Sequence, residues 1–302
     1  MDPSTTARKI TSMEVRGALE IAMAAADSLK EYAGGYTGND FLKDFRVQVE
    51  MLRKSRPTAV SLPNTLDYIC YLAGEYPREA LPNMIDNFLK KQNEARARIA
   101  EIGAKRIRSG DVILTHCNSN TALETIKLAA KTKKNISVVC TETRPRNQGY
   151  LTAAFMAKNK IPVTLIVDSA VRYAMEELDI KKVLVGADVV AANGAVGNKI
   201  GTSQVALAAK ETNIPFMVAC ETIKFSPQTY EGQMIPIEER KHSEIRPHMK
   251  GVKMWNPAFD FTPPEYIDVL ITEDGIISPY MAYEVLKDKF SWEISKSICR
   301  KA

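Results

Sequence analysis

Short apolar runs in the second half of this sequence are each followed by side chains that could do chemistry. His116 and Cys117 follow the first run, Arg144 comes shortly after the second, and Asp188 and Lys224 follow later ones. Open parallel sheets carry their ligands beyond the carboxyl ends of the strands, so we expect these groups to meet at one edge of a sheet. A thiol, cations and carboxylates together are typical of a functional site and not of a buried core.

Cys117 is the candidate working thiol. The sequence has five cysteines, no CxxC spacing and three histidines, which disfavours a structural zinc site. A reducing cytoplasm, which we expect here, leaves such thiols free. A lone cysteine after a strand can also be a small buried hydrophobe. We keep that interpretation for Cys70, Cys140, Cys220 and Cys299. His116 either tunes the Cys117 thiol or caps the strand.

Asp188 and the segment 198–202 are the next candidates. Asp188 ends an apolar run, and burial would raise the pKa of its carboxyl enough to hold a proton near neutral pH. The alternative is an aspartate that caps the next turn. The segment 198–202 (Asn-Lys-Ile-Gly-Thr) is expected to open a helix, and its composition suits a phosphate cradle, although it is no P-loop. Arg144 and Lys224 are either anion ligands or ordinary surface charges.

Composition excludes several classes of protein. The chain has 302 residues, 45% of them hydrophobic and 25% charged, with a formal net charge of +5. Acidic and basic residues are interspersed, which differs from the basic patch of a nucleic-acid-binding protein. No apolar run approaches the 18 or so residues of a membrane span, and residues 1–12 do not resemble a signal peptide. We expect a cytoplasmic protein that handles an anionic small molecule.

The first part, 1–108, is expected to be a helical domain. A capping box at Thr11 and Glu14 predicts the start of a helix that Gly34-Gly35 ends. Further helices are expected near 39–54 and over 83–107, with a link between Pro57 and Pro63.

Gly17 interrupts an otherwise good helical pattern, and Arg56 lies in a rigid polar segment. Glycine in a helix interior costs about 1 kcal/mol relative to alanine, which suggests a close approach to a ligand or another backbone. Both segments either line a cleft between the domains or serve as plain connectors.

In the second part, 109–302, the helical spacing of apolar residues gives way to short apolar runs. Its β-branched runs lie at 112–115, 136–141, 162–167, 182–187, 215–220 and 267–272. Helical segments separate most of them, at 121–131, 151–158, 169–178 and 201–212. Apolar runs alternating with helices predict a Rossmann-like, doubly wound, mostly parallel sheet with helices on both faces. The fold class is therefore α/β.

These segments together resemble the superfamily of translation initiation factor 2B regulatory subunits and sugar-1-phosphate aldose–ketose isomerases, over roughly 12–290. The residues that carry the resemblance are Arg16-Gly17-Ala18, Arg56-Pro57-Thr58-Ala59-Val60, His116-Cys117-Asn118-Ser119, Thr143-Arg144-Pro145, Gln148-Gly149, Gly186-Ala187-Asp188, Asn193-Gly194, Asn198-Lys199-Ile200-Gly201-Thr202, Glu221-Thr222-Ile223-Lys224-Phe225 and Trp255-Asn256-Pro257-Ala258-Phe259-Asp260.

The branch of this superfamily decides the expected function. Factor subunits of the eukaryotic type lack the cysteine and aspartate that stand here as Cys117 and Asp188. The sequence is most similar to the archaeal isomerases that convert ribose 1,5-bisphosphate to ribulose 1,5-bisphosphate, in nucleotide salvage that feeds RuBisCO. Methylthioribose-1-phosphate isomerases share the pair, but an Asn-Ala-Gly type run follows their cysteine, where this chain has Ser119-Asn120-Thr121 after Asn118. A regulatory binding subunit and a methylthioribose-1-phosphate isomerase remain the alternatives.

The resemblance also implies roles for individual residues. Cys117 as a thiolate is the base at C2 of the sugar, and Asp188, protonated at the start, is the acid. The implied substrate contacts are Arg16, Gly17, Ala18, Arg56, Ser119, Asn120, Arg144, Asn198, Lys199 and Lys224. Proton transfer needs no cofactor and no metal. The expected partners are a phosphorylated pentose and further copies of the chain, as a homodimer or hexamer, with no nucleic acid and no membrane.

Overall fold

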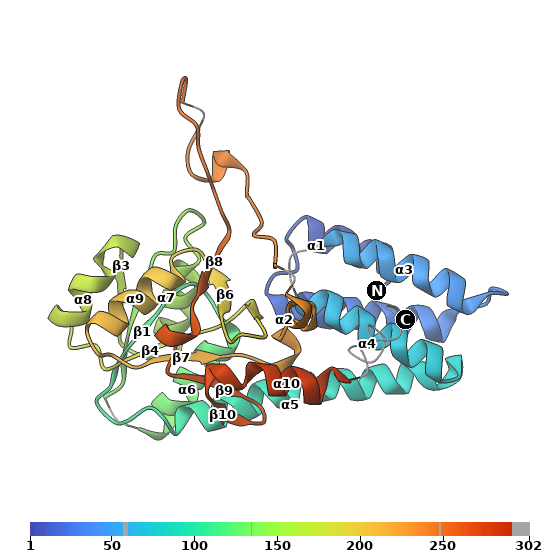
Figure 1. The fold of residues 1–302 in the computed structure, drawn as a ribbon, viewed down its shortest axis with the longest axis horizontal. Helices are drawn as coiled ribbons and strands as arrows, with labels where there is room; N and C mark the ends of the chain where they lie inside the picture. Colours follow the sequence, from blue (N-terminus) through green and yellow to red (C-terminus); the bar gives the residue numbers. More distant parts are fainter. Residues whose placement is uncertain (57–59, 134, 233, 248, 292–302) are drawn as a thin grey trace. The chain divides into compact units, whose positions relative to one another are not determined.

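A computed structural model describes residues 1–56, 60–133, 135–232, 234–247 and 249–291 (Figure 1). Pro57, expected in a link, and Cys299, expected to be structural, lie outside the described residues. The chain divides into two compact units, Met1–Ala95 and Arg96–Ala302. The division falls inside α5 (Leu81–Ala104), whereas the sequence placed the boundary after residue 108. Among the described residues, no helix is long and apolar enough to cross a membrane.

The first unit is helical, as the sequence predicted. Its elements are α1 (Pro3–Thr11), α2 (Ala18–Gly35), α3 (Phe41–Ser55), α4 (Ser61–Glu75), η1 (Arg78–Ala80) and the start of α5. The core is built from one apolar face of each long helix. Its fully buried side chains include Ile21, Leu29, Phe45, Leu52, Leu62, Leu66 and Ile69.

Three local predictions for the first unit are wrong. Thr11 does not open a helix, because α1 ends there and α2 begins at Ala18. Gly17 precedes α2 with φ of 91°, so it serves a backbone conformation that side chains disfavour and does not interrupt a helix. Pro63 lies in the first turn of α4 and not in a link, since the first N–H groups of a helix have no intrahelical acceptor.

The second unit is built on a seven-stranded sheet with the strand order β10-β9-β7-β4-β1-β2-β3 (Figure 1). The parallel strands are β1 (Val112–Thr115), β2 (Ser137–Thr141), β3 (Val163–Ile166), β4 (Lys182–Val185), β7 (Phe216–Ala219) and β9 (Val269–Thr272). In the part of the chain that the structure describes, β10 (Gly275–Ile277) is the one antiparallel strand of this sheet. The prediction of a doubly wound, mostly parallel sheet is confirmed.

Alternate residues along the central strands enter different cores, which is why these strands read as continuous apolar runs. Leu114 packs in one core with the helices α8 (Val171–Glu177), α9 (Thr202–Glu211) and α10 (Ala282–Lys289). Ile113, its neighbour, packs in the other core with the end of α5, with α6 (Asn120–Thr132) and with α7 (Gly149–Lys158). Both faces of the sheet are therefore covered.

The strand order reverses between β1 and β4. From β1 the chain adds β2 and β3 on one side, and then returns to add β4, β7 and β9 on the other. β1 and β4 are paired, with Ile113 opposite Lys182 and Leu114 opposite Val183. In an open α/β sheet, the crevice beyond the carboxyl ends at such a reversal is the usual ligand site.

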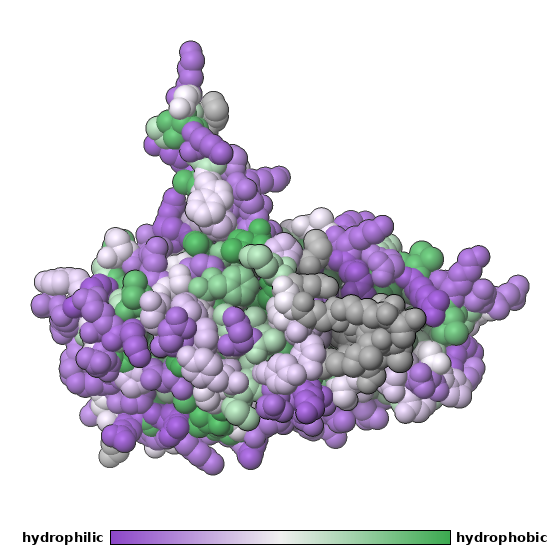
Figure 2. Space-filling model, viewed as in Figure 1, coloured by the Kyte–Doolittle hydropathy of each residue, from purple (hydrophilic) through white to green (hydrophobic). Residues whose placement is uncertain are grey.

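Two further features were not expected from the sequence. A small antiparallel sheet is formed by β5 (Val189–Val190), β6 (Val196–Lys199) and β8 (Phe259–Thr262). The segments 234–247 and 249–258 extend as an arm, orange in Figure 1, with a short helix η5 (His242–Glu244). The arm carries apolar groups among hydrophilic ones (Figure 2), and Met234 and Trp255 are 93% and 73% exposed.

Candidate functional site

Cys117 and Asp188 follow the two strands that flank the reversal of strand order. Cys117 comes just after β1, and Asp188 follows the end of β4. The charge of Asp188 acts on the thiol of Cys117, and so does the charge of Lys199 at the end of β6. The structure therefore brings these three residues into one neighbourhood. Asp188 is half-buried, although the sequence suggested a largely desolvated carboxylate.

The thiol of Cys117 holds its proton at neutral pH. Burial raises its pKa to about 11, and the negative charge of Asp188 acts in the same direction. The charge of Lys199 lowers the pKa, but it does not outweigh burial. The protonated thiol differs from the thiolate that the resemblance implies, so a thiolate requires that a nearby group accept the proton.

Cys117 has an unusual backbone, with φ of 69°. Such a left-handed conformation costs a residue with a side chain roughly 1–2 kcal/mol. Its N–H donates to Thr143 Oγ1 at 2.9 Å, and its carbonyl accepts from Thr152 Oγ1 at 2.7 Å. Both polar groups of the Cys117 backbone are thus held by threonine hydroxyls.

His116 is buried and neutral. Its Nδ1 lies 2.7 Å from Thr141 Oγ1, and its Nε2 lies 2.9 Å from the carbonyl oxygen of Ile200. A carbonyl only accepts, so Nε2 carries the proton and Nδ1 accepts from the threonine. Burial lowers the pKa of His116, which keeps the imidazole uncharged. Of the two expectations for this residue, tuning of the thiol by an imidazolium charge does not fit.

The loop after β2 is fixed by Asp168, which follows β3. The carboxylate of Asp168 accepts from the N–H of Thr143 at 2.8 Å and from the N–H of Arg144 at 2.7 Å. The guanidinium of Arg144 is exposed and donates to the carbonyl of Ile245 on the arm at 2.9 Å. Arg144 therefore ties the arm to the rim of the site.

Lys224 and Glu221 form a buried ion pair beyond the end of β7. Lys224 Nζ lies 2.8 Å from Glu221 Oε2, and Thr121 at the start of α6 donates to the same carboxylate. Burial alone would lower the pKa of Lys224, but the charge and hydrogen bond of Glu221 outweigh it, so the pKa is raised. Lys224 is therefore a fixed, charged ammonium close enough to Asp188 to feel its charge.

The carboxylate of Asp260 occupies part of the segment 198–202, whose role as a phosphate cradle stays a prediction. Asn198 and Lys199 end β6, and α9 begins only at Thr202. The carboxylate of Asp260 already accepts from the N–H groups of Gly201 and Ser203 at the start of α9, at 2.7 and 3.2 Å. Asn198 donates to Thr202 Oγ1 at 3.1 Å.

Lys199 is a cation near the thiol of Cys117. Its Nζ lies 4.6 Å from the ring centre of Phe259. That contact holds the ammonium by a cation–π attraction while most of the side chain is buried.

Ser119 and Asn120 open α6. Ser119 is the N-cap, and its Oγ accepts from the N–H of Ala122 at 3.4 Å. Gly186 lies directly against it, because a Cβ at that position would stand 2.2 Å from Ser119 Oγ. Asn120 is exposed.

The other substrate contacts implied by the resemblance belong to the first unit. Arg16, whose Nε donates to the carbonyl of Met13 at 2.7 Å, immediately precedes the Gly17–Ala18 start of α2. Ser61 Oγ donates to the carbonyl of Ala18 at 2.7 Å, and Arg56 follows α3. A role for these residues beside Cys117 stays a prediction.

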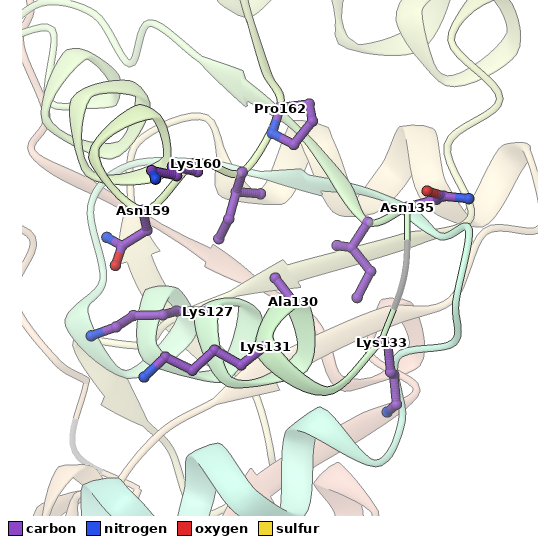
Figure 3. Close-up of a pocket in the computed structure, with 10 residues that line it drawn as sticks. Lys127, Ala130, Lys131, Lys133, Asn135, Asn159, Lys160 and Pro162 are labelled. Atoms are coloured by element: carbon purple, nitrogen blue, oxygen red, sulfur yellow. The ribbon is translucent and has the colours of Figure 1, made fainter.

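A cationic pocket of about 310 Å³ lies elsewhere on the second unit (Figure 3). It is lined by residues at the ends of α6 and α7 and around the starts of β2 and β3, including Lys127, Lys131 and Lys160. These positions are at the amino ends of the strands, opposite the edge that carries Cys117. Lysines in the last turn of a helix complement its dipole, so a structural role accounts for Lys131.

Sequence reasoning passed over several residues that shape this site. Thr141, Thr152 and Asp260 were not candidates, yet each bonds a segment that carries a candidate residue. Among them, only Asp260 stood in a motif that carried the resemblance. The threonines give no local signal, because their partners are 25 and 35 residues away in the chain.

The fold and the site together define a doubly wound α/β protein with a thiol and a carboxylate at the reversal of its strand order. The chain belongs to the initiation factor 2 subunit family, whose model matches residues 14–279. It is 49% identical to the ribose 1,5-bisphosphate isomerase of Methanocaldococcus jannaschii, over 95% of each chain. It is also 49% identical to the isomerase of the same name from Archaeoglobus fulgidus, over 95% of this chain and 93% of the relative.

Solved structures show the same fold. The translation initiation factor eIF-2B of Pyrococcus horikoshii matches with a TM-score of 0.81 and 32% identity, over 91% of this chain and 96% of its own. The 5-methylthioribose 1-phosphate isomerase of the same organism matches with a TM-score of 0.78 and 31% identity, over 96% of this chain and 88% of its own.

Proposed function

We propose that this protein is an aldose–ketose isomerase that converts ribose 1,5-bisphosphate into ribulose 1,5-bisphosphate. The observation that carries the proposal is the pair of Cys117 and Asp188 beyond the adjacent strands β1 and β4, with Lys199 and Lys224 beside it. The archaeal relatives named ribose 1,5-bisphosphate isomerase, 49% identical over nearly the whole chain, support this choice of substrate.

The isomerisation moves only protons and electron pairs. Opening the sugar ring places a proton on the ring oxygen, and loss of the C2 proton forms a double bond between C1 and C2. Delivery of a proton to C1 and loss of the C2 hydroxyl proton then give the ketone. Two protons enter and two leave, so the product is an isomer. In this scheme Cys117 carries the proton from C2 to C1. Asp188 donates a proton to the ring oxygen and accepts the proton of the C2 hydroxyl.

The chemistry needs one proton shared between Cys117 and Asp188. A thiol with a carboxylate, and a thiolate with a carboxylic acid, are the two placements of that same proton. Burial favours the thiol in the structure. Transfer of the proton from Sγ to the carboxylate produces the thiolate base and the carboxylic acid that the reaction requires. Asp188 is therefore the group that accepts the proton when Cys117 becomes a base.

The cations of the site suit a bisphosphate. Lys199 and Lys224 are fixed, by the ring of Phe259 and by Glu221 respectively. We assign them to substrate phosphate or hydroxyl groups, together with Asn198, Ser119 and Asn120. Arg16, Gly17, Ala18, Arg56 and Arg144 complete the proposed set of substrate contacts.

Parallel turnover assays test the substrate. Purified protein is incubated with ribose 1,5-bisphosphate and, separately, with methylthioribose 1-phosphate, and the ketose product is measured. We expect turnover of the bisphosphate at a kcat/KM at least about 100-fold higher, because the lysines are matched to a second phosphate. The reverse preference would assign the chain to the activity named for the P. horikoshii neighbour. Turnover of neither substrate would contradict the proposal.

The likeness to the P. horikoshii initiation factor is the basis of the alternative, a regulatory binding subunit. A pull-down with purified initiation factor 2 distinguishes the two functions. We expect no stable complex, because the thiol, the carboxylate and the lysines are arranged around a small-molecule site. A stable stoichiometric complex together with no turnover would favour the binding subunit.

We further propose that the chain forms a homo-oligomer in the cytoplasm. Strand β3 is an edge strand, and Leu165 and Val167 on it and just beyond it are 45% and 52% exposed, as is Leu151 on α7 at 53%. Exposed apolar edges are ready places for association with another chain. Light scattering is expected to show a dimer or hexamer. Leu165→Lys is expected to weaken this association and lower the measured molecular mass. A monomer at micromolar concentration would contradict this.

A further inference from the structure

The strained backbone of Cys117 is held by a chain of hydrogen bonds that the proposed reaction does not itself use. The chain begins at the N–H of Cys117, which donates to Thr143 Oγ1 at 2.9 Å. Thr143 Oγ1 lies 3.1 Å from Thr141 Oγ1, which in turn lies 2.7 Å from His116 Nδ1. His116 Nε2 completes the chain at the carbonyl of Ile200.

The directions of the bonds around His116 follow from the Ile200 carbonyl, which can only accept. The neutral His116 therefore donates from Nε2 and accepts at Nδ1 from the hydroxyl of Thr141. The hydroxyl of Thr143 accepts from the Cys117 N–H and has two acceptors on Thr141, its Oγ1 at 3.1 Å and its carbonyl oxygen at 3.3 Å. Thr143 is therefore bonded to both Cys117 and Thr141.

The hydrogen-bond chain also joins the segment that carries the thiol to the segment that carries Lys199. Ile200 stands between Lys199 and Gly201, so His116 bonds directly to the turn that follows Lys199. Gly201 has φ of 99°, and a Cβ there would come within 3.1 Å of the imidazole. The imidazole thus packs closely against this turn. The segments of Cys117 and of Lys199 are therefore both held by hydrogen bonds that lead to the same buried imidazole.

Thr143 is itself held in place. Its φ is 61°, and Asp168 accepts from its N–H and from the next N–H in the chain. The turns after the neighbouring strands β1 and β2 therefore each contain a residue with a left-handed backbone, Cys117 and Thr143, and a hydrogen bond joins these two residues. Residues in such conformations persist only where the surroundings over-determine them, and they cluster at functional sites.

We propose that His116, Thr141 and Thr143 are positioning residues that aim the Cys117 thiol and keep it in register with Lys199. The inference rests on the proposed role of Cys117 as the base. Misplacement of a reacting group by about 1 Å can cost about 100-fold in rate, so loss of this chain is expected to lower kcat and leave substrate binding largely unchanged.

Thr143→Val and Thr143→Ser test the proposal, because valine keeps the shape without the hydroxyl and serine keeps the hydroxyl without the methyl. For Thr143→Val we expect kcat on ribose 1,5-bisphosphate to fall by about 100-fold with KM within about threefold. For Thr143→Ser we expect kcat within about threefold of the wild type. Thr132→Val, at the end of α6 where the hydroxyl only bonds carbonyls of its own helix, is the matched control.

A second readout does not depend on turnover. The rate at which iodoacetamide alkylates Cys117 at pH 8 is followed by mass spectrometry of its peptide. We expect an increase of about fivefold or more in Thr143→Val, because a thiol released from its buried position ionises more readily. If the wild type does not isomerise the sugar, the proposed function fails, while this readout still decides the positioning role.

Two results would overturn the proposal. One is wild-type kcat and wild-type alkylation in Thr143→Val. The other is equal damage in Thr143→Ser and Thr143→Val, which would assign the effect to packing of the methyl group. If Thr143→Val does not give a folded protein by circular dichroism, Thr141→Val breaks the same chain one bond further from the thiol. A drop of about tenfold in kcat is then expected, and a wild-type kcat would contradict the positioning role of these hydrogen bonds.

Discussion

At the scale of single residues, the site separates groups that are free to react from groups that are committed to structure. Asp168 and Asp260 each accept backbone N–H groups, and Glu221 pairs with Lys224. In the described part of the chain, the carboxylate of Asp188 makes none of these bonds. The rim therefore carries several carboxylates, and we propose that Asp188 is the one that exchanges a proton with Cys117.

The ionisation of Cys117 is the first prediction at this scale. The alkylation rate of Cys117 without substrate is expected to rise about tenfold per pH unit from pH 7 to pH 10 without levelling, because burial holds the thiol pKa at about 11. Lys199→Met removes the charge that lowers this pKa, so the rate at a given pH is expected to fall further.

Lys131→Met, in the pocket at the opposite edge of the sheet, is the control and is expected to leave the rate unchanged. A rate that levels off below pH 9 would show that Cys117 ionises more easily than its burial allows. It would also remove the need for Asp188 as the acceptor of the proton.

At the scale of elements, close packing fixes the loops that carry the site. Gly186 after β4 lies against Ser119 at the start of α6, and the Glu221–Lys224 pair after β7 is bonded to Thr121 on the same helix. Helix α6 thus begins on contacts with the ends of two neighbouring strands. Both contacts give specific predictions for stability.

Gly186→Ala is expected to lower the free energy of unfolding by about 1–3 kcal/mol, because its Cβ would stand 2.2 Å from Ser119 Oγ. The serine cannot move away without losing the cap of α6. Gly74→Ala on α4, with nothing within 4 Å of the added carbon, is the matched control and is expected to be neutral or stabilising by up to about 1 kcal/mol. Denaturant titration measures both, and equal effects would contradict the contact.

Glu221→Gln is expected to cost about 3–5 kcal/mol, because it leaves the Lys224 ammonium buried without its counter-charge. The double variant with Lys224→Met is expected to cost less than the sum of the two single changes. Additive losses in denaturant titrations would show that the two side chains do not interact. Glu221 raises the pKa of Lys224, so the ion pair stabilises the fold at pH values where the lysine is charged. The difference in stability between the wild type and Glu221→Gln is therefore expected to be largest below the pKa of Lys224 and to shrink as the pH rises through it.

The parallel sheet and its helices were predictable because local pattern decides them. The runs at 112–115 and 182–187 are apolar on both faces, and both faces of the sheet are covered. The edge that carries Cys117 and Asp188 follows from the strand order. The short strands β5, β6 and β8 were not predictable, since their pairing joins residues as far apart as Lys199 and Phe259. The bond from Asp260 on β8 to the start of α9 was not predictable for the same reason.

The details around Cys117 also lay beyond sequence reasoning. The backbone is left-handed at Cys117 and Thr143, and neither position is a glycine, which is the residue that would have indicated such a conformation. The bonds that hold it come from β2, α7 and the turn before α9. A thiol after a strand was visible, but the threonines and the neutral imidazole that hold it become visible only when the strands are side by side.

At the scale of the whole molecule, the substrate contacts that the family resemblance implies are divided between the two units of the chain. Cys117, Asp188 and the two lysines belong to the second unit, and Arg16 and Arg56 belong to the first. The contribution of the first unit is thus a prediction about function.

Arg16→Gln is expected to raise KM for ribose 1,5-bisphosphate by about tenfold, the loss of one charged hydrogen bond, with little change in stability. Arg8→Gln on α1 is the control in the same unit and is expected to leave KM unchanged. Unchanged KM in both Arg16→Gln and Arg56→Gln would confine the site to the second unit.

Turnover of ribose 1,5-bisphosphate by Cys117→Ser and Asp188→Asn, with Lys131→Met as the folded control, decides whether these two residues carry the reaction. We expect ribulose 1,5-bisphosphate from the wild type and the control. For each of the other two variants we expect a loss of at least about 1,000-fold in kcat, because neither can move the single shared proton. Wild-type turnover by either variant would show that Cys117 and Asp188 are not the catalytic pair.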